Sequence, residues 1–181
     1  LETRQRDEKD EIYFDKEAFA RGGDPYDFMG SESKLWFHEP RDYGYQQADQ
    51  PLVDATEVKG HAVRAMYFYA AATDLARICP NDEMSERLDT ALARLWRDLV
   101  DGKIYVTGSI GSVTQNEGFG RPYSLLDLEH PGCSNETCAC FALINWCQRM
   151  LWRELESEYS DIMETDLYKG FLGAISQDCD D

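Results

Sequence analysis

The chain has 181 residues, with 35 acidic and 18 basic side chains and a formal net charge of −17, a length that fits one domain or a large part of one. Hydrophobic residues make up 43% of it and aromatic residues 12%, which is enough for a packed core and argues against disorder. A chain this acidic repels phosphate backbones and anionic membrane surfaces. Neither nucleic acid nor a membrane is therefore an expected partner. No apolar run reaches the roughly 18 residues of a membrane helix.

The N-terminal part carries no apolar signal segment and starts at Leu1 rather than methionine. We therefore expect a fragment or a processed product, in which any original signal is unseen. A helix is predicted over 11–21, where Gly22 and Gly23 follow it. Residues 22–56 contain four glycines and three prolines and are predicted to form a long loop. Loops of this length in compact domains are usually functional.

Four further helices are predicted, and helix dominates the chain. The clearest covers 57–79, and its middle, AVRAMYFYAAA, is apolar nearly all round. A helix without a polar face is buried on several sides, as an inner helix of a two-layered helical barrel is. An amphipathic helix to about residue 100 follows a cap at Asn81 or Asp82. Helices over 136–155 and 157–175 complete a set of antiparallel pairs.

One short β element is predicted between these helices. The β-branched run KIYVT at 103–107 favours a strand. Residues 108–134 contain five glycines and two prolines, which predicts a second long loop. We therefore expect one mainly α domain over 1–181, with 22–56 and 108–134 as loops within it.

A carboxylate and a thiol lie two residues apart in NETCAC (135–140), at a predicted helix N-terminus. The free N–H groups and the helix dipole there favour the carboxylate of Glu136 and a thiolate at Cys138, and both groups are zinc ligands. Two ligands are too few, so others would have to come from elsewhere. The spacing alone favours cysteines that act as small buried hydrophobes. A disulfide between Cys133 and Cys138 is a further alternative, without supporting context.

Two other residues are candidates for sugar chemistry. Glu117 lies in QNEGFGRP, where glycines let a loop approach a ligand and a carboxylate can do acid–base work on a sugar; composition alone does not separate it from a solvated loop glutamate. His61 is predicted one turn into the most buried helix, on the face of Glu57 and Arg64. This polar cluster could point into a cavity, although the local pattern alone favours a hydrogen-bonded core histidine.

Five motifs in unbroken order carry a family resemblance. They are TEVKGHAVRAMYFYAA (56–71), KIYVTGSIGS (103–112), NEGFG (116–120), NETCACFALINWCQRML (135–151) and YSDIMETDLYKGFLGAIS (159–176). Together they resemble glycoside hydrolase family 127, the β-L-arabinofuranosidases that release L-arabinose, over roughly residues 40–178. The resemblance implies part of an (α/α)6 barrel, truncated at both ends, and an L-arabinofuranosyl oligosaccharide or glycoconjugate as substrate.

The resemblance also implies roles for individual residues. Glu117 matches the general acid/base of a retaining glycosidase, and His61 matches a residue that lines the sugar site. Glu136 and Cys138 match ligands of one zinc ion. The implied nucleophile is a zinc-bound cysteine of a downstream Cys-Cys pair. This chain contains no Cys-Cys, so we expect it to be inactive by itself, and the need for reduced thiols favours a cytoplasmic location.

Two alternatives remain open at this point. One is a non-catalytic helical remnant, in which the residues that match the motifs persist as packing. The other is a related glycosidase that acts on another pectic sugar, because most residues that would shape the substrate subsites lie outside this chain. The sequence does not define an oligomeric state.

Overall fold

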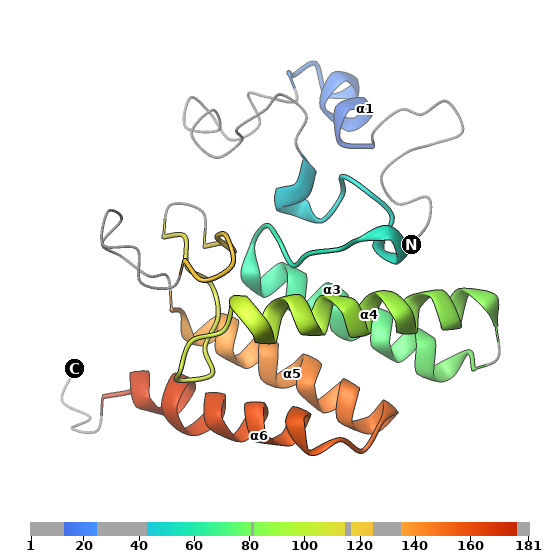
Figure 1. The fold of residues 1–181 in the computed structure, drawn as a ribbon. Helices are drawn as coiled ribbons and strands as arrows, with labels where there is room; N and C mark the ends of the chain where they lie inside the picture. Colours follow the sequence, from blue (N-terminus) through green and yellow to red (C-terminus); the bar gives the residue numbers. More distant parts are fainter. Residues whose placement is uncertain (1–12, 25–42, 81, 115–116, 125–134, 177–181) are drawn as a thin grey trace.

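The computed structural model describes residues 13–24, 43–80, 82–114, 117–124 and 135–176. Within these residues helix dominates, as the sequence predicts, and the main body is a stack of long helices (Figure 1). Its helices are α3 (Ala62–Ile78), α4 (Glu83–Gly102), α5 (Thr137–Arg153) and α6 (Ser157–Thr165). The preceding segments form α1 (Tyr13–Ala20) and two short 3-10 turns, η2 (Tyr43–Gln46) and η3 (Leu52–Asp54).

The order of packing brings two helix N-termini to one end of the stack. α3 packs against both α4 and α5, and α5 packs against α6. Successive helices run in opposite directions, so α3 and α5 begin at the same end (Figure 1). The described part of the loop that follows α4 also lies there. Side chains on these three segments can therefore contribute to one site.

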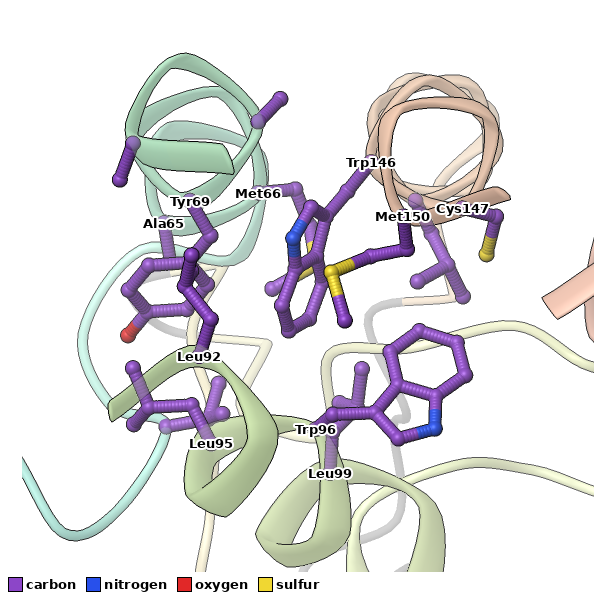
Figure 2. Packing of buried hydrophobic residues seen from close by; sticks show 14 of the residues in the cluster. Ala65, Met66, Tyr69, Leu92, Leu95, Trp96, Leu99, Trp146, Cys147 and Met150 are labelled. Atoms are coloured by element: carbon purple, nitrogen blue, oxygen red, sulfur yellow. The ribbon is translucent and has the colours of Figure 1, made fainter. Parts of the chain in front are cut away.

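Aromatic side chains from four helices pack together in the core, and Figure 2 shows three of them, Tyr69, Trp96 and Trp146. The ring of Trp146 lies 5.2 Å from that of Tyr69 and 5.3 Å from that of Trp96, and Trp96 lies 4.8 Å from Tyr159. Such tilted and edge-on pairs stabilise a core beyond their buried area. The indole N–H of Trp146 donates to Thr73 Oγ1 at 3.1 Å, so this buried polar group is satisfied. The core thus fixes α3, α4, α5 and α6 against one another.

A buried lysine fixes the segment in front of α3. The Lys103 side chain is 4% exposed, and its Nζ donates to Val58 O at 2.7 Å and pairs with Asp98 Oδ2 at 2.9 Å. The same carboxylate accepts from Val58 N at 2.6 Å. A buried charge is stable in such a setting because it is both paired and hydrogen-bonded. The backbone just before His61 is therefore attached to the C-terminal end of α4.

The predicted helix over 57–79 begins five residues later than expected, at Ala62. Gly60 has φ +76° and breaks the helical conformation before His61, which is the N-cap. Glu57 therefore does not share a helix face with His61; its carboxylate lies 3.8 Å from Lys103 Nζ. The apolar far side of α3 remains exposed, with Tyr67, Leu75 and Ile78 between 43% and 65% accessible.

The predicted strand over 103–107 reduces to isolated bridges. Ile104 pairs with Ile110, and Val113 pairs with Gly118, which also bridges to His61. No longer ladder occurs among the described residues, because Gly108 and Gly111, both with positive φ, turn the chain too soon. The second loop thus begins with two tight turns, the second closed by the Val113–Gly118 bridge; its residues 115–116 and 125–134, like residues 25–42 of the first loop, lie outside the described part.

The last predicted helix changes its winding half-way. α6 ends at Thr165, continues as a π-helical turn, η4 (Asp166–Phe171), and closes with a 3-10 turn, η5 (Leu172–Ala174). Within the described residues no helix combines the length and the apolar character needed to cross a membrane. Single π-helical turns within helices are frequent at functional sites, so η4 is a candidate for a functional role.

Candidate active site

The structure brings His61 and Glu117 into direct contact. His61 Nε2 lies 3.2 Å from Glu117 Oε2; the imidazole is 18% exposed and the carboxylate side chain 52% exposed. These residues come from the start of α3 and from the second hairpin turn. A carboxyl group that is held on one side by an imidazole and open to solvent on the other can transfer protons to a bound ligand.

Backbone hydrogen bonds fix this contact. Ala62 N donates to Glu117 O and Phe119 N donates to Gly60 O, both at 2.9 Å. Together with the bridge between His61 and Gly118, they attach the turn to the first residues of α3. Glu117 itself has φ 54°, a left-handed conformation that is uncommon for a residue with a side chain. Such conformations persist where the surrounding structure enforces them, and they gather at functional sites.

His61 also caps α3 with its side chain. Its Nδ1 accepts from Arg64 N at 3.4 Å, so the neutral imidazole carries its proton on Nε2 and donates it to Glu117. The histidine is thus partly exposed at a helix start rather than enclosed in the core. The ring of Tyr45 lies 6.0 Å from the imidazole, and the Arg64 guanidinium covers that ring at 5.1 Å. Burial raises the pKa of Tyr45, an effect that the neighbouring Arg64 guanidinium only partly offsets, so the phenol remains neutral.

Glu136 and Cys138 form a second pair, at the start of α5. Glu136 is the N-cap residue but does not cap the helix with its side chain; instead its Oε2 accepts from the Cys138 thiol at 3.1 Å. Partial burial, and then the neighbouring carboxylate, raise the pKa of Cys138. The helix N-terminus was expected to favour a thiolate at Cys138, and this expectation is wrong because burial, and then the carboxylate beside the sulfur, oppose a second negative charge.

The pair has the chemistry of a partial zinc site. One oxygen and one sulfur donor converge at hydrogen-bond distance, and both are common zinc ligands. Among the described residues no third histidine, cysteine or acid completes a cluster. Cys138 is a free thiol, and Cys133, its suggested disulfide partner, lies outside the described residues.

Comparison with known proteins identifies the family. The family description "Beta-L-arabinofuranosidase, GH127 catalytic domain" matches residues 13–181. The chain belongs to glycoside hydrolase family 127. It is 35% identical over 144 residues to a non-reducing end β-L-arabinofuranosidase of Bifidobacterium longum subsp. longum, an alignment that covers 80% of this chain and 20% of that protein.

Solved structures of family 127 agree with the fold. The chain matches the crystal structure of a family 127 β-L-arabinofuranosidase from Geobacillus stearothermophilus T6 with a TM-score of 0.76 and 32% identity, over 97% of this chain and 24% of that one. A second family 127 β-arabinofuranosidase gives a TM-score of 0.66 and 31% identity, over 90% of this chain and 25% of that one. The chain thus spans about a fifth to a quarter of these relatives and forms part of a helical barrel.

Three residues near the two pairs were not found as site residues from the sequence. The sequence marks Tyr45 only as one of several loop aromatics, able to stack on a sugar or to cover the core, and Arg64 only as a charge on the His61 face. Asp166 gave no signal, because one acid among many in the predicted helix over 157–175 resembles a solvated side chain. In the structure Asp166 is fully buried.

Proposed function

We propose that the complete gene product carrying this chain is a retaining glycoside hydrolase that releases β-L-arabinofuranose from non-reducing ends. Its substrates would be L-arabinofuranosyl oligosaccharides or glycoconjugates. The observation that carries the proposal is the His61–Glu117 contact, a solvent-facing carboxyl group held by an imidazole at 3.2 Å. Two relatives described as β-L-arabinofuranosidases support the choice of sugar.

Glu117 is the general acid/base in this proposal. Protonated, it gives its proton to the glycosidic oxygen as the bond to the sugar breaks; ionised, it takes a proton from the water that releases the sugar. The contact with His61 Nε2 fixes the direction of Oε2 and leaves the other carboxyl oxygen for the leaving group. His61 lines the sugar site beside Glu117 in this proposal and orients it, because both of its ring nitrogens already have partners, Glu117 Oε2 and Arg64 N.

Glu136 and Cys138 are proposed as two ligands of one zinc ion. Their donor atoms converge and are of the types that zinc prefers. When bound, zinc would hold a cysteine sulfur as thiolate at neutral pH. The Cys138 thiol donates its proton in a hydrogen bond to Glu136, and this proton must leave when a metal binds. The affinity for zinc should therefore rise with pH. Further ligands and the implied nucleophilic cysteine are not in this pair, and the chain contains no Cys-Cys.

A panel of 4-nitrophenyl glycosides tests this function on the complete gene product. We expect fastest turnover of the β-L-arabinofuranoside, slow or no turnover of its α anomer and of an α-L-rhamnopyranoside, and a first sugar product of retained configuration by NMR. Glu117→Gln should lower turnover of a natural disaccharide 10²–10⁴-fold. Glu86→Gln, an exposed glutamate on α4, is the matched control. Preference for another sugar would replace the proposed substrate, and no turnover of any would favour a non-catalytic protein.

A further inference from the structure

Asp166 is a fully buried acid with an unusual environment. Its side chain is 0% exposed, and neither carboxyl oxygen has a hydrogen-bond partner of normal geometry among the described residues. An unpaired buried carboxylate is costly, so such a group tends to be neutral. Burial raises the pKa of Asp166 to about 6, an effect that the facing Cys140 thiol only partly offsets. Asp166 is also the first residue of the π-helical turn η4.

Three polar groups from three segments converge beside Gly170. A methyl group built on Gly170 would lie 2.5 Å from Ser109 Oγ, 3.1 Å from Cys140 Sγ and closer still to Asp166 Oδ1. Only a glycine leaves room for this arrangement, because any side chain would displace the three groups. Ser109 is itself fully buried, and its hydroxyl lies 2.9 Å from Thr107 Oγ1. The Asp166 carboxyl group therefore shares a buried space with the polar groups of Ser109 and Cys140.

The first of these segments leads to Glu117. A methyl group at Gly108 would lie 2.6 Å from Asp166 N and 2.8 Å from Asp166 Cα, so the turn over 107–109 rests directly on this backbone. Ile110 follows, fully buried. Ser112 N then donates to Gly118 O at 3.0 Å and starts the hairpin turn that presents Glu117. Movement of the 107–109 turn would therefore shift the proposed acid/base.

The second segment carries the proposed zinc ligands. Cys140 N donates to Glu136 O at 3.1 Å, so the Cys140 sulfur belongs to the same helical turn as Glu136 and Cys138. This sulfur faces Asp166 and Ser109, whereas Cys138 is exposed. Asp166 thus lies between the segment that leads to Glu117 and the turn that holds Glu136.

We propose that Asp166 is a positioning residue whose buried carboxyl group holds the 107–109 turn against the first turn of α5, and so fixes Glu117 relative to the Glu136–Cys138 pair. This inference rests on the proposed function for its catalytic consequence, but not for its structural one. Among the described residues, the other titratable groups that interact with Asp166 are the Cys140 and Cys147 thiols. Burial raises the pKa of both, so neither supplies a charge that would compensate a carboxylate.

Two variants at this position test the proposal in the complete gene product. Asp166→Ala should lower kcat on the aryl β-L-arabinofuranoside about tenfold and leave KM within about twofold. Asp166→Asn keeps the shape and a donor without the charge, so kcat should stay within about threefold of wild type. Asp161→Asn, the same change at an exposed position on α6, is the matched control. An Asn variant as impaired as the Ala variant, or an Ala variant with wild-type kcat, would overturn the proposal.

Amide hydrogen exchange tests the positioning role of Asp166 without a substrate. In wild type, protection factors over 104–110 and 137–141 should decrease between pH 5 and pH 7, as the buried carboxyl ionises. In Asp166→Asn they should be constant over this range. An equal decrease in both proteins would overturn the positioning role, even if Asp166→Ala does not fold. If wild type had no glycosidase activity, but its protection decreased with pH while that of Asp166→Asn stayed constant, the positioning contact would be supported and the proposed reaction removed.

Discussion

The imidazole of His61 lies 3.2 Å from the carboxylate of Glu117, and two backbone hydrogen bonds join the residues on either side of this contact. The side chains meet because the backbone of Glu117 and Gly118 pairs with the residues at the start of α3. The contact is therefore a product of backbone geometry as well as of charge. Disturbing either the side chain or the backbone should impair the site in different ways.

Substitutions of His61 separate its two contacts. Asparagine is a good N-cap but is too short to reach Glu117, so His61→Asn should keep the stability of α3 and lower kcat/KM about 10- to 100-fold. His61→Ala should show the same kinetic loss and a further loss of about 1 kcal/mol in unfolding free energy. Steady-state kinetics of the two variants measures the loss in kcat/KM, and chemical denaturation measures the change in unfolding free energy. Equal activity of His61→Asn and wild type would exclude a role of the contact in turnover.

A substitution at Gly60 tests the backbone contribution to the contact between His61 and Glu117. Its φ is +76°, and an added methyl group would lie 2.5 Å from both Gln47 Nε2 and Gly44 O. Gly60→Ala should therefore destabilise the protein by more than the roughly 1–2 kcal/mol of left-handed strain alone, and should also lower activity. Gly22→Ala is the control, because Gly22 has φ +75° and nothing within 4 Å of the added methyl. If the two variants melted at the same temperature, the packing around Gly60 would not be as described.

Substitutions of the two exposed cysteines, Cys138 and Cys79, should affect zinc binding differently. Cys138→Ser should reduce zinc content and affinity of the complete gene product, whereas Cys79→Ser, an exposed cysteine at the other end of α3, should not. Because the pKa of Cys138 is raised, its proton competes with the metal, and wild-type affinity should increase from pH 6.5 to pH 8. Elemental analysis and competition titrations measure both effects. Stoichiometric zinc in Cys138→Ser with unchanged affinity would contradict the ligand role.

Asp166 should make stability depend on pH. Its folded-state pKa of about 6 lies above the ordinary 3.8, so the native state binds the proton more tightly than the unfolded state. The stabilisation is complete below about pH 4 and is lost as pH rises to about 6, by at most about 3 kcal/mol. Asp166→Asn should lack this slope and gain stability relative to wild type at pH 7. Urea denaturation of both proteins at pH 4.5 and pH 7 measures the change in unfolding free energy with pH. Equal changes in wild type and Asp166→Asn would mean that Asp166 is not the group whose titration causes the pH dependence.

The elements that the sequence predicts well are those with local signals. The apolar and amphipathic periods of α3, α4 and α5 are strong enough to locate these helices. The late start of α3 is not local, because it depends on Lys103 and Asp98 holding Val58 from the end of α4. The proximity of Glu136 and Cys138 follows from spacing, whereas that of His61 and Glu117 needs the fold. Burial of Asp166 requires the π-helical turn and the space at Gly108 and Gly170, which no single segment reveals.

The central claim is that Glu117 transfers the protons in hydrolysis, and azide rescue of Glu117→Gln tests it most directly. An aryl β-L-arabinofuranoside with a good leaving group needs little protonation in the first step, so the covalent sugar–enzyme intermediate should accumulate in this variant. Azide attacks without giving up a proton, so it should restore turnover and yield an arabinofuranosyl azide of retained configuration. If Glu117→Gln instead turned over a natural disaccharide at nearly the wild-type rate, with no effect of azide, Glu117 would be a loop carboxylate and the account of the site would be wrong.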